Sequence, residues 1–235
     1  MGSATGLLDG SPRVQLSLDL PALDEAMATA EIGVRAGIDW LEAGTPLILG
    51  EGLHAVRALH ERFPRHPVVA DLKTMDAGYL EAEMMFRAGA EFVVVMAVAH
   101  ERTVREAVRA ARDHGRHVMA DLMLHADKPG MARRLQEWGV DVILVHTGYD
   151  ERHHDPGCSP LRDLEAVRAA VDLPLQAVGG LTIEQAARMP GLGAPLVVIG
   201  APLAVADQEF RPAADPQGLH RVLREFVRAV KGAQA

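Results

Sequence analysis

Short apolar runs rich in β-branched residues alternate with longer segments of helical periodicity along most of the chain. The runs have the length of strands, and the segments between them repeat apolar residues every three to four positions, as amphipathic helices do. Several runs, such as FVVVM at 92–96, are apolar throughout, which is typical of parallel strands covered by helices on both faces. The pattern predicts strands at 14–19, 39–44, 67–73, 92–97, 117–123, 141–148, 173–180 and 194–200.

Eight helical segments separate and follow these strands, so that the chain reads as eight strand–helix units. Eight such units in 235 residues predict a single (β/α)8 TIM barrel, which takes about 200 residues or more. A doubly wound open sheet is the alternative, but no G-x-G-x-x-G motif follows the first strand. Helices are expected at 24–36, 52–63, 79–90, 103–115, 131–139, 161–171, 183–189 and 218–230.

Two helix starts have clear signals. Thr182 followed by Gln185 predicts a capping box, in which each side chain bonds to the backbone N–H of the other residue. Ser159 before Pro160 predicts a serine N-cap with proline at the first helical position.

The repeating units define one domain, which we expect to span residues 14–231 between flexible ends at 1–13 and 232–235. Both ends are short and lack periodicity. The formal net charge of −8 disfavours nucleic acid as a partner and leaves a small molecule as the expected ligand. Cys158 is the only cysteine, and neither a signal peptide nor an apolar run of membrane-spanning length is found. We therefore expect a soluble, cytoplasmic protein without membrane attachment.

Residues suited to chemistry gather where the predicted strands end. In a barrel, the loops after the strands form the functional face and bring such residues into one cavity. For any one of them, a helix cap or a solvated charge is an adequate explanation, but five strand ends carry a carboxylate or an imidazole. The residues at these ends are Asp19, Glu42, Asp71, Lys73, Asp76, Met96, Asp121, His146, Gly179, Gly180 and Gly200.

The stretch VVADLKTMDAG at 68–78 is the densest of these groups, because an apolar strand runs directly into Asp71, Lys73 and Asp76. Glu42 and Asp71 are suited to hold one Mg²⁺, which usually takes one or two protein carboxylates and completes its shell with water and substrate oxygens. The flanking carboxylates favour the protonated form of Lys73. Such a group stabilises an oxyanion or an enediolate, although a purely structural ion-pair cluster remains the alternative.

Glycines follow the last two predicted strands, in QAVGGLTIEQ and VVIGAPLA. The backbone N–H groups of such turns, with a helix N-terminus behind them, are able to hold a phosphate dianion. Barrels often bind phosphate at the loops after strands seven and eight. Gly179, Gly180 and Gly200 are therefore candidate phosphate-binding residues.

The stretch DLKTMDAG after VVA resembles the Asp-x-Lys-x-x-Asp signature of the orotidine-monophosphate decarboxylase suprafamily, specifically its 3-hexulose-6-phosphate synthase branch. The segments LEAGTPLILGEGLHAVR, VHTGYD and VGGLT resemble that branch too, and the similarity extends from about Val14 to Ala206. The resemblance implies a Mg²⁺-dependent barrel, with Mn²⁺ as an alternative metal. Its reaction would join formaldehyde to D-ribulose 5-phosphate, giving D-arabino-hex-3-ulose 6-phosphate, and run reversibly through an enediolate.

The same resemblance implies roles for individual residues. Glu42 and Asp71 would be the metal ligands, Lys73 would hydrogen-bond the enediolate oxygen, and Asp19 would contact sugar hydroxyls or Lys73. Asp76 would come from the neighbouring subunit of a homodimer. His146 would move the C1 proton, and the main-chain N–H groups would bind phosphate at Gly179, Gly180, Gly200 and Ala201.

Several positions depart from the patterns of these relatives. The 3-keto-L-gulonate-6-phosphate decarboxylases carry an arginine where this chain has Tyr149, which disfavours their activity. Pro202 lacks the N–H that a permissive glycine-rich turn would offer to phosphate. His100 and His125, with Lys128 beside the latter, also reach the functional face, where they either alter the substrate or are solvated loop residues. The segment ERHHDPGC at 151–158 lacks the spacing of a zinc site and predicts a surface loop.

Three functions therefore remain open from the sequence. The first is an aldolase of the synthase type. The second is a lyase or decarboxylase that acts on another phosphorylated keto-sugar acid, such as 3-keto-L-gulonate 6-phosphate. The third is a catalytically silent barrel that binds sugar phosphates, since fold and motif do not prove turnover.

Overall fold

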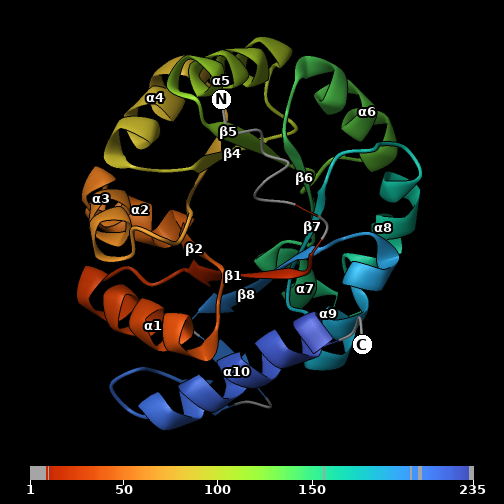
Figure 1. The fold of residues 1–235 in the computed structure, drawn as a ribbon. Coiled ribbons are helices and arrows are strands. Elements are labelled where there is room, and N and C mark those ends of the chain that lie inside the picture. The colour runs from red at the N-terminus through yellow and green to blue at the C-terminus, as the bar shows by residue number, and fades with distance from the viewer. Residues whose placement is uncertain (1–8, 10, 156, 202, 206–207, 233–235) are drawn as a thin grey trace.

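The computed structural model describes residues 9, 11–155, 157–201, 203–205 and 208–232. Eight parallel strands close into a barrel in which each strand pairs with the next and β8 pairs with β1, so the predicted fold is confirmed (Figure 1). The strands are β1 (Arg13–Leu18), β2 (Trp40–Ala43), β3 (Val68–Thr74), β4 (Phe92–Met96), β5 (His117–Asp121), β6 (Val142–His146), β7 (Leu175–Val178) and β8 (Leu196–Ala201).

Helices surround the barrel and bury its outer surface (Figure 1). Several end in a glycine at positive φ, as at Gly37 and Gly89, because this left-handed conformation closes the last helical turn without a Cβ clash. The helices are α1 (Leu23–Ala36), α2 (Thr45–Glu51), α3 (Leu53–Arg62), α4 (Gly78–Ala88), α5 (Glu101–His114), α6 (Lys128–Trp138), α7 (Tyr149–His154), α8 (Leu161–Arg168), α9 (Ile183–Arg188) and α10 (Pro216–Gly232), with a 3-10 turn at Pro190–Leu192.

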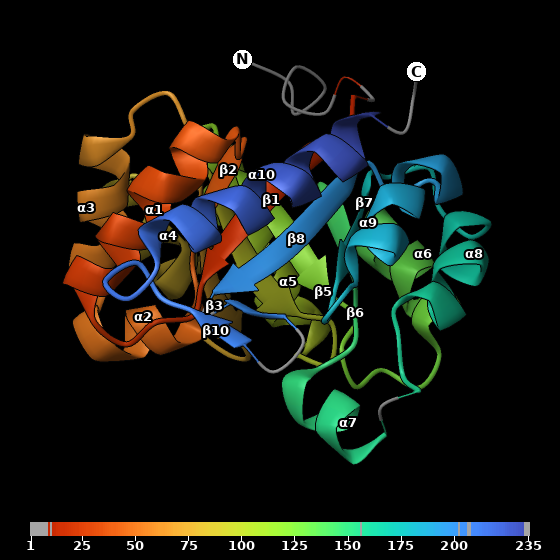
Figure 2. The same cartoon turned by 90° about the horizontal axis from the view of Figure 1, so that it is seen from below.

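Two helices and two strands were not expected from the sequence. The helices α2 and α7 lie in segments too short to show a helical period, and α7 makes part of the expected surface loop at 151–158 helical. A small antiparallel pair, β9 (Leu203–Val205) and β10 (Gln208–Phe210), follows β8. Figure 2 shows α7 and β10 at the end of the barrel to which the strand arrows point.

The two helix-start predictions have different outcomes. The capping box of Thr182 and Gln185 is confirmed, with both reciprocal hydrogen bonds present. The predicted cap at Ser159 is wrong by one residue, because α8 begins at Leu161 and Pro160 is the capping residue. The hydroxyl of Ser159 still accepts a hydrogen bond of 3.4 Å from the N–H of Leu161. The fixed φ of proline is compatible with either side of the boundary, so sequence alone does not separate them.

The secondary structure extends one residue beyond each end of the predicted domain, since the strand β1 begins at Arg13 and the helix α10 ends at Gly232. The ends expected to be flexible, 1–13 and 232–235, lie largely outside the described residues, as does Pro202. No helix in the described ranges is both long and apolar enough to cross a membrane.

The barrel interior has its own apolar core, separate from the larger core between strands and helices. The rings of Trp40 and Phe92 stack there with their centroids 4.6 Å apart. We call this group the interior apolar cluster; it comprises Trp40, Val69, Phe92, Val94, Met119, Val142, Leu144 and Leu196. Packed side chains therefore fill the barrel below its open end, as in other eight-stranded barrels.

Candidate active site

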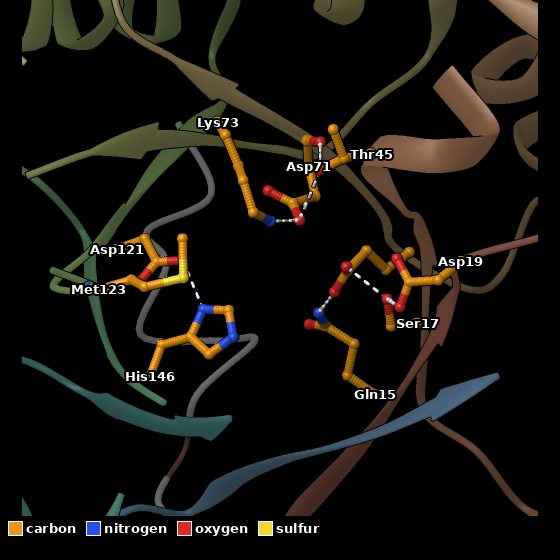
Figure 3. A network of polar contacts seen from close by, with 10 residues as sticks. Gln15, Ser17, Asp19, Thr45, Asp71, Lys73, Asp121, Met123 and His146 are labelled. Atoms are coloured by element: carbon orange, nitrogen blue, oxygen red, sulfur yellow. Dashed lines mark hydrogen bonds and ion pairs between the residues drawn. The ribbon is translucent and has the colours of Figure 1, made fainter. Parts of the chain in front are cut away.

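Charged side chains replace the apolar ones at the carboxyl ends of the strands. Because side chains alternate along a strand, Glu42 lies on the same face as Trp40, and Asp121 on the same face as Met119. Figure 3 shows Lys73 and Asp71, Asp121 and His146, and Asp19 pointing into a common space from different sides of the barrel. Glu42 joins them through the hydrogen bond that it accepts from Ser17. We call these charged side chains the mouth cluster: Asp19, Glu42, Asp71, Lys73, Asp121 and His146.

The end of β3 is irregular where it delivers two members of this cluster. Ala70 pairs with Val93 and Thr74 pairs with Val95, so β3 takes four residue steps where β4 takes two. Lys73 lies in this bulge with a φ of 50°. A non-glycine residue at positive φ costs about 1–3 kcal/mol and persists only where surrounding structure holds it. The strain accompanies the placement of Lys73 beside Asp71 at the barrel mouth.

Glu42 is held by a chain of buried polar side chains that crosses the barrel interior. Gln176 donates a hydrogen bond of 2.8 Å to Gln15, which in turn donates to Oε2 of Glu42. The Ser17 hydroxyl lies 2.6 Å from Oε1 of Glu42 and 3.0 Å from Oδ2 of Asp19. A hydroxyl has a single proton to donate, so Ser17 serves one of the two carboxylates at a time.

Two of the carboxylates have raised pKa values. Burial, with Asp71 and Asp19 as negative neighbours, raises the pKa of Glu42 to about 8. Burial also raises the pKa of Asp19, against the hydrogen bond from Ser17, and the negative charge of Asp71 adds to the increase. Without a counter-ion, the site therefore favours a proton on Glu42 at neutral pH.

Asp71 is the centre of the contacts on the β3 side. Its Oδ2 forms an ion pair with the Lys73 ammonium and accepts a hydrogen bond of 3.1 Å from the hydroxyl of Thr45 on α2. The same hydroxyl lies 2.8 Å from the Asp71 backbone carbonyl oxygen. Burial lowers the pKa of Lys73, but the charge of Asp71 and its hydrogen bond outweigh this and raise the pKa above its usual value. Lys73 is thus a stable cation at this site.

The donor set fits a divalent metal ion such as Mg²⁺. The Oδ1 atom of Asp71 is buried without a hydrogen-bond partner in the described part of the chain, and Glu42 is held neutral only by its surroundings. A hard cation would satisfy the free oxygen and compensate the negative charge of both carboxylates. Among the described residues, no three His, Cys, Asp or Glu side chains form a metal-binding group. The protein would therefore supply two ligands, and water or substrate the rest.

His146 and Asp121 form a pair across the mouth from these carboxylates. The Nδ1 atom of His146 lies 2.7 Å from Oδ2 of Asp121, whose other oxygen accepts a hydrogen bond of 2.8 Å from the N–H of Met123 (Figure 3). Burial raises the pKa of Asp121, but His146, the Met123 N–H and Lys73 together outweigh it and lower the pKa. An ionised Asp121 orients the imidazole and leaves Nε2 as its free nitrogen. Sequence reasoning noted Asp121 at a strand end without assigning it this role.

The glycines expected to bind phosphate lie after β7 and within β8. Gly179 and Gly180 have positive φ values of 122° and 61°, and Gly200 pairs with Ser17 of β1. No hydrogen bond involves the backbone N–H of Gly179 or Gly180 within the described ranges. These donors are therefore available to a ligand. Ala201 is the last residue of β8.

Asp76 does not join the mouth cluster. It is exposed, and its carboxylate accepts a hydrogen bond of 2.8 Å from the N–H of the adjacent Ala77. Although Asp76 and Lys73 are close in sequence, neither a hydrogen bond nor an ion pair joins them in the described part of the chain.

The two additional histidines have local roles in the structure. His100 caps α5, because its Nδ1 accepts a hydrogen bond of 3.1 Å from the N–H of Arg102. His125 accepts a bond of 3.2 Å from the N–H of Asp127, and Lys128 forms an ion pair with Asp163. A cavity of about 160 Å³ lies beside the mouth, lined by His125, Lys128, Thr147, Glu151, Cys158 and Arg162 among others.

A closed parallel barrel whose open end gathers carboxylates, a lysine and a histidine–aspartate pair is the architecture of a barrel enzyme. The sequence profile of the orotidine 5'-phosphate decarboxylase / HUMPS family matches residues 12–211, so the chain belongs to this family. It is similar to a curated protein of Methylomonas aminofaciens named 3-hexulose-6-phosphate synthase, with 34% identity over 87% of this chain and 97% of the relative.

Solved structures agree with this membership. The 3-hexulose-6-phosphate synthase from Salmonella typhimurium is similar with a TM-score of 0.81 and 32% identity, over 93% of this chain and 99% of that protein. The 3-keto-L-gulonate-6-phosphate decarboxylase from Vibrio cholerae is similar with a TM-score of 0.75 and 26% identity, over 92% and 97% of the two chains. The present chain is thus an enzyme of the lyase type.

Proposed function

We propose that this enzyme catalyses the reversible aldol condensation of formaldehyde with D-ribulose 5-phosphate, which gives D-arabino-hex-3-ulose 6-phosphate. The observation that carries the proposal is the mouth cluster, in which the Lys73 cation and buried carboxylates face the His146–Asp121 pair across one space (Figure 3). The named synthases among the relatives support the choice of substrates.

The chemistry requires the removal of a proton beside a ketone at neutral pH. In the proposed reaction, Nε2 of His146 takes the proton from C1 of the ketose, and the electron pair moves to form an enediolate with negative charge on the C2 oxygen. The fixed ammonium of Lys73 stabilises that charge as it develops. Asp121 orients the imidazole and stabilises its cationic form.

The carbon–carbon bond then forms between C1 of the enediolate and the carbon of formaldehyde. The oxygen of formaldehyde takes the proton from His146, so the histidine returns to its starting form and the atoms balance. Cleavage of the product follows the same steps in reverse. Asp19, which lies beside Ser17 at the end of β1, is placed to bind a hydroxyl of the sugar.

Glu42 and Asp71 would hold the Mg²⁺ ion, or Mn²⁺ in its place. When bound, the metal would supply positive charge that fixes and polarises substrate oxygens beside Lys73. The phosphate group would lie against the free N–H groups of Gly179 and Gly180, with Gly200 and Ala201 at the end of the adjacent strand.

We propose further that the enzyme is a homodimer in which Asp76 completes the site of the partner subunit. Asp76 is exposed just before α4 and forms no ion pair with Lys73 among the described residues. Large apolar side chains are exposed nearby in sequence, with Met75 at 53%, Leu80 at 57% and Met84 at 41% of their surface. Single exposed apolar residues are ordinary, but three within ten positions favour a protein interface.

Mixed dimers test the shared site. Subunits carrying Asp76→Ala should be mixed with subunits carrying Lys73→Ala, because one of the two sites in the heterodimer then keeps both residues. The expected result is partial recovery of turnover relative to either variant alone. Verified heterodimers that recover no activity would argue against Asp76 acting across the interface.

The reaction itself is tested with purified enzyme, ribulose 5-phosphate and formaldehyde, by following formaldehyde loss with and without a chelator. Consumption that the chelator abolishes and Mg²⁺ restores is the expected result. If folded, metal-loaded protein consumes no formaldehyde, the proposal is wrong, and phosphorylated keto-sugar acids become the next substrates. Tyr149 replaces the arginine of the decarboxylases, so we expect the aldol reaction to be the faster of the two. A protein without turnover on either class would be a sugar-phosphate-binding barrel.

A further inference from the structure

One arginine near the glycine turn after β7 has no assigned role. Arg152 lies on α7, the short helix after β6, and its guanidinium extends to the turn that follows β7. A Cβ atom added to Gly180 would lie 2.2 Å from Nη1 of Arg152, so the guanidinium rests directly against the glycine. The same turn contacts the β6 loop at a second point, where a Cβ on Gly179 would lie 2.4 Å from the Thr147 carbonyl oxygen.

The guanidinium of Arg152 is without an acceptor in the described part of the chain. Its Nε atom is buried and unpaired, and neither a hydrogen bond nor an ion pair involves its side chain there. Besides Gly180, the guanidinium lies near the ring of Tyr149, with its carbon 5.7 Å from the ring centroid. Leaving a buried donor unsatisfied costs free energy, and more so for a charged group. An arginine held in this way is suited to an anionic ligand.

The position of this cation matches the chemistry of a phosphate monoester. Such a group carries about −1.5 to −2 charges at pH 7 and offers three strong acceptor oxygens. The free N–H groups of Gly179 and Gly180 supply neutral donors only. A guanidinium presents several N–H donors in a planar fork, whose geometry matches two phosphate oxygens.

We propose that Arg152 is a phosphate-binding residue, whose guanidinium donates hydrogen bonds to the phosphate of the sugar phosphate held at Gly179 and Gly180. The inference rests on the proposed function for the identity of the ligand, but the anion site itself does not depend on turnover. Arg152 thereby links α7 to the occupied site, so that phosphate binding also orders the end of the β6 loop beside His146.

The first experiment measures the binding of inorganic phosphate by calorimetry at constant ionic strength. Arg152→Gln should weaken phosphate binding by about 10- to 100-fold, the usual size for the loss of charge-assisted hydrogen bonds. Arg152→Lys should recover part of the affinity, because it keeps the charge but not the fork. Arg134→Gln, which removes an exposed arginine from α6, is the matched control and should bind like the wild type.

Steady-state kinetics should show the same change as a rise in KM for ribulose 5-phosphate, with kcat within a few-fold of the wild type. One outcome is that the wild type binds phosphate more tightly than Arg152→Lys, and Arg152→Lys more tightly than Arg152→Gln, while no aldol activity is found. That result would support the Arg152 site and refute only the proposed reaction. A folded Arg152→Gln variant that binds phosphate as tightly as the wild type would overturn the inference. A wild type without measurable phosphate binding would overturn it too.

A second measurement needs no variant and so does not depend on folding. The wild-type protein is treated with an arginine-specific dicarbonyl reagent, and the modified peptides are quantified by mass spectrometry. Inorganic phosphate should slow the modification of Arg152 and leave that of Arg134 unchanged. Equal modification of Arg152 with and without phosphate would contradict its place in the anion site.

Discussion

The two ends of the barrel interior are built from the same strands but have opposite properties. A single residue separates Trp40 from Glu42, and Met119 from Asp121. The first of each pair nevertheless packs in the interior apolar cluster, and the second lies in the mouth cluster. The closed end buries aromatic and aliphatic surface, which stabilises the fold. The open end buries like charges and holds Lys73 at a positive φ, which costs stability.

The apolar end thus stabilises the fold, and the open end holds the residues for chemistry. Truncation of a side chain at the apolar end leaves a cavity in a close-packed interior and so costs stability. The open end instead buries charges that a bound ligand would compensate. Variants of the apolar end should therefore lose stability and keep their chemistry. Variants of the mouth cluster should lose chemistry, and removal of one of its like charges, as in Glu42→Gln, should raise the stability.

The largest effect is expected for Phe92→Ala in the interior apolar cluster. Phe92 is fully buried and stacks on Trp40, so the substitution should lower the free energy of unfolding by about 3–5 kcal/mol. Urea denaturation measures this, and kcat of the folded fraction should stay within a few-fold of the wild type. Leu192→Ala, which truncates an exposed leucine, is the control and should change the stability by less than about 0.5 kcal/mol. A stable Phe92→Ala enzyme would show that the cluster does not support the fold.

The next effect concerns the charged end. Lys73→Ala should lower kcat by roughly 10²–10³-fold or more, as the loss of preorganised oxyanion stabilisation usually does. The stability should fall as well, because alanine keeps the positive φ of this position and leaves the buried carboxylate of Asp71 without its cation. Lys231→Ala, which removes the lysine paired with Asp39 on the outside of the barrel, should leave kcat unchanged. Near-normal turnover by Lys73→Ala would refute the mechanism proposed above.

The third prediction concerns the stability of the metal-free Glu42→Gln variant at the charged end. The folded-state pKa of Glu42 is raised to about 8 from its ordinary 4.5, so the fold favours the protonated carboxyl. The contribution of this proton to the stability of the protein is complete below pH 4.5 and is lost as the pH rises through 8. At pH 8 the free energy of unfolding of the variant should therefore be about 2–4 kcal/mol higher than that of the wild type, because one pKa unit corresponds to about 1.4 kcal/mol. Chemical denaturation at pH 5 and pH 8 in the presence of a chelator measures the difference.

The control for this experiment is Glu225→Gln, which removes an exposed carboxylate from α10 and should behave alike at both pH values. Addition of Mg²⁺ should stabilise the wild type more than Glu42→Gln at pH 8, since only the wild type offers both carboxylates. Equal stability of wild type and Glu42→Gln at both pH values would show that the fold does not raise the pKa of Glu42.

The smallest effect is expected for Asp121→Asn. The pKa of Asp121 is lowered in the fold, so its stabilisation is present above the ordinary value of 3.8 and is lost as the pH falls through the folded-state value. The variant should be less stable than the wild type by about 1.5 kcal/mol at pH 7, the scale of a hydrogen bond to a charged group. The gap should close towards pH 2, as measured by denaturation across this range. Asp172→Asn, at an exposed position, should show no such dependence on pH; a gap that persists in acid would contradict the ionised pair.

Much of the architecture follows from local patterns. The strands at 92–96 and 142–146 are apolar runs with β-branched residues, and a strand that is apolar on both faces has few alternatives to a buried parallel sheet. The capping box at Thr182 is complete within four residues, so it was predictable. By contrast, α2 and α7 are shorter than the window in which a helical period can be recognised, and tertiary contacts decide their conformation.

The sequence predicted where the residues of the candidate site lie better than it predicted which of them contact one another. A carboxylate or histidine after a barrel strand is expected at the functional face, which applies to Glu42, Asp71 and His146. The pairing of His146 with Asp121 joins neighbouring strands that are 25 residues apart, and nothing in the local sequence of either residue indicates the other. Arg152 was hidden for the same reason, since its partner turn lies on the next strand.

The sequence by itself determined the eight strand–helix units and the residues at the strand ends, because periodicity and strand length are local properties of the chain. The tertiary structure alone decided which of these residues meet. Closure of the barrel placed His146 against Asp121, Glu42 against Ser17 and Arg152 against Gly180, and Asp76 did not join the mouth cluster. The physical reason is that charge, burial and hydrogen bonding depend on distances through space, which the order of residues does not specify.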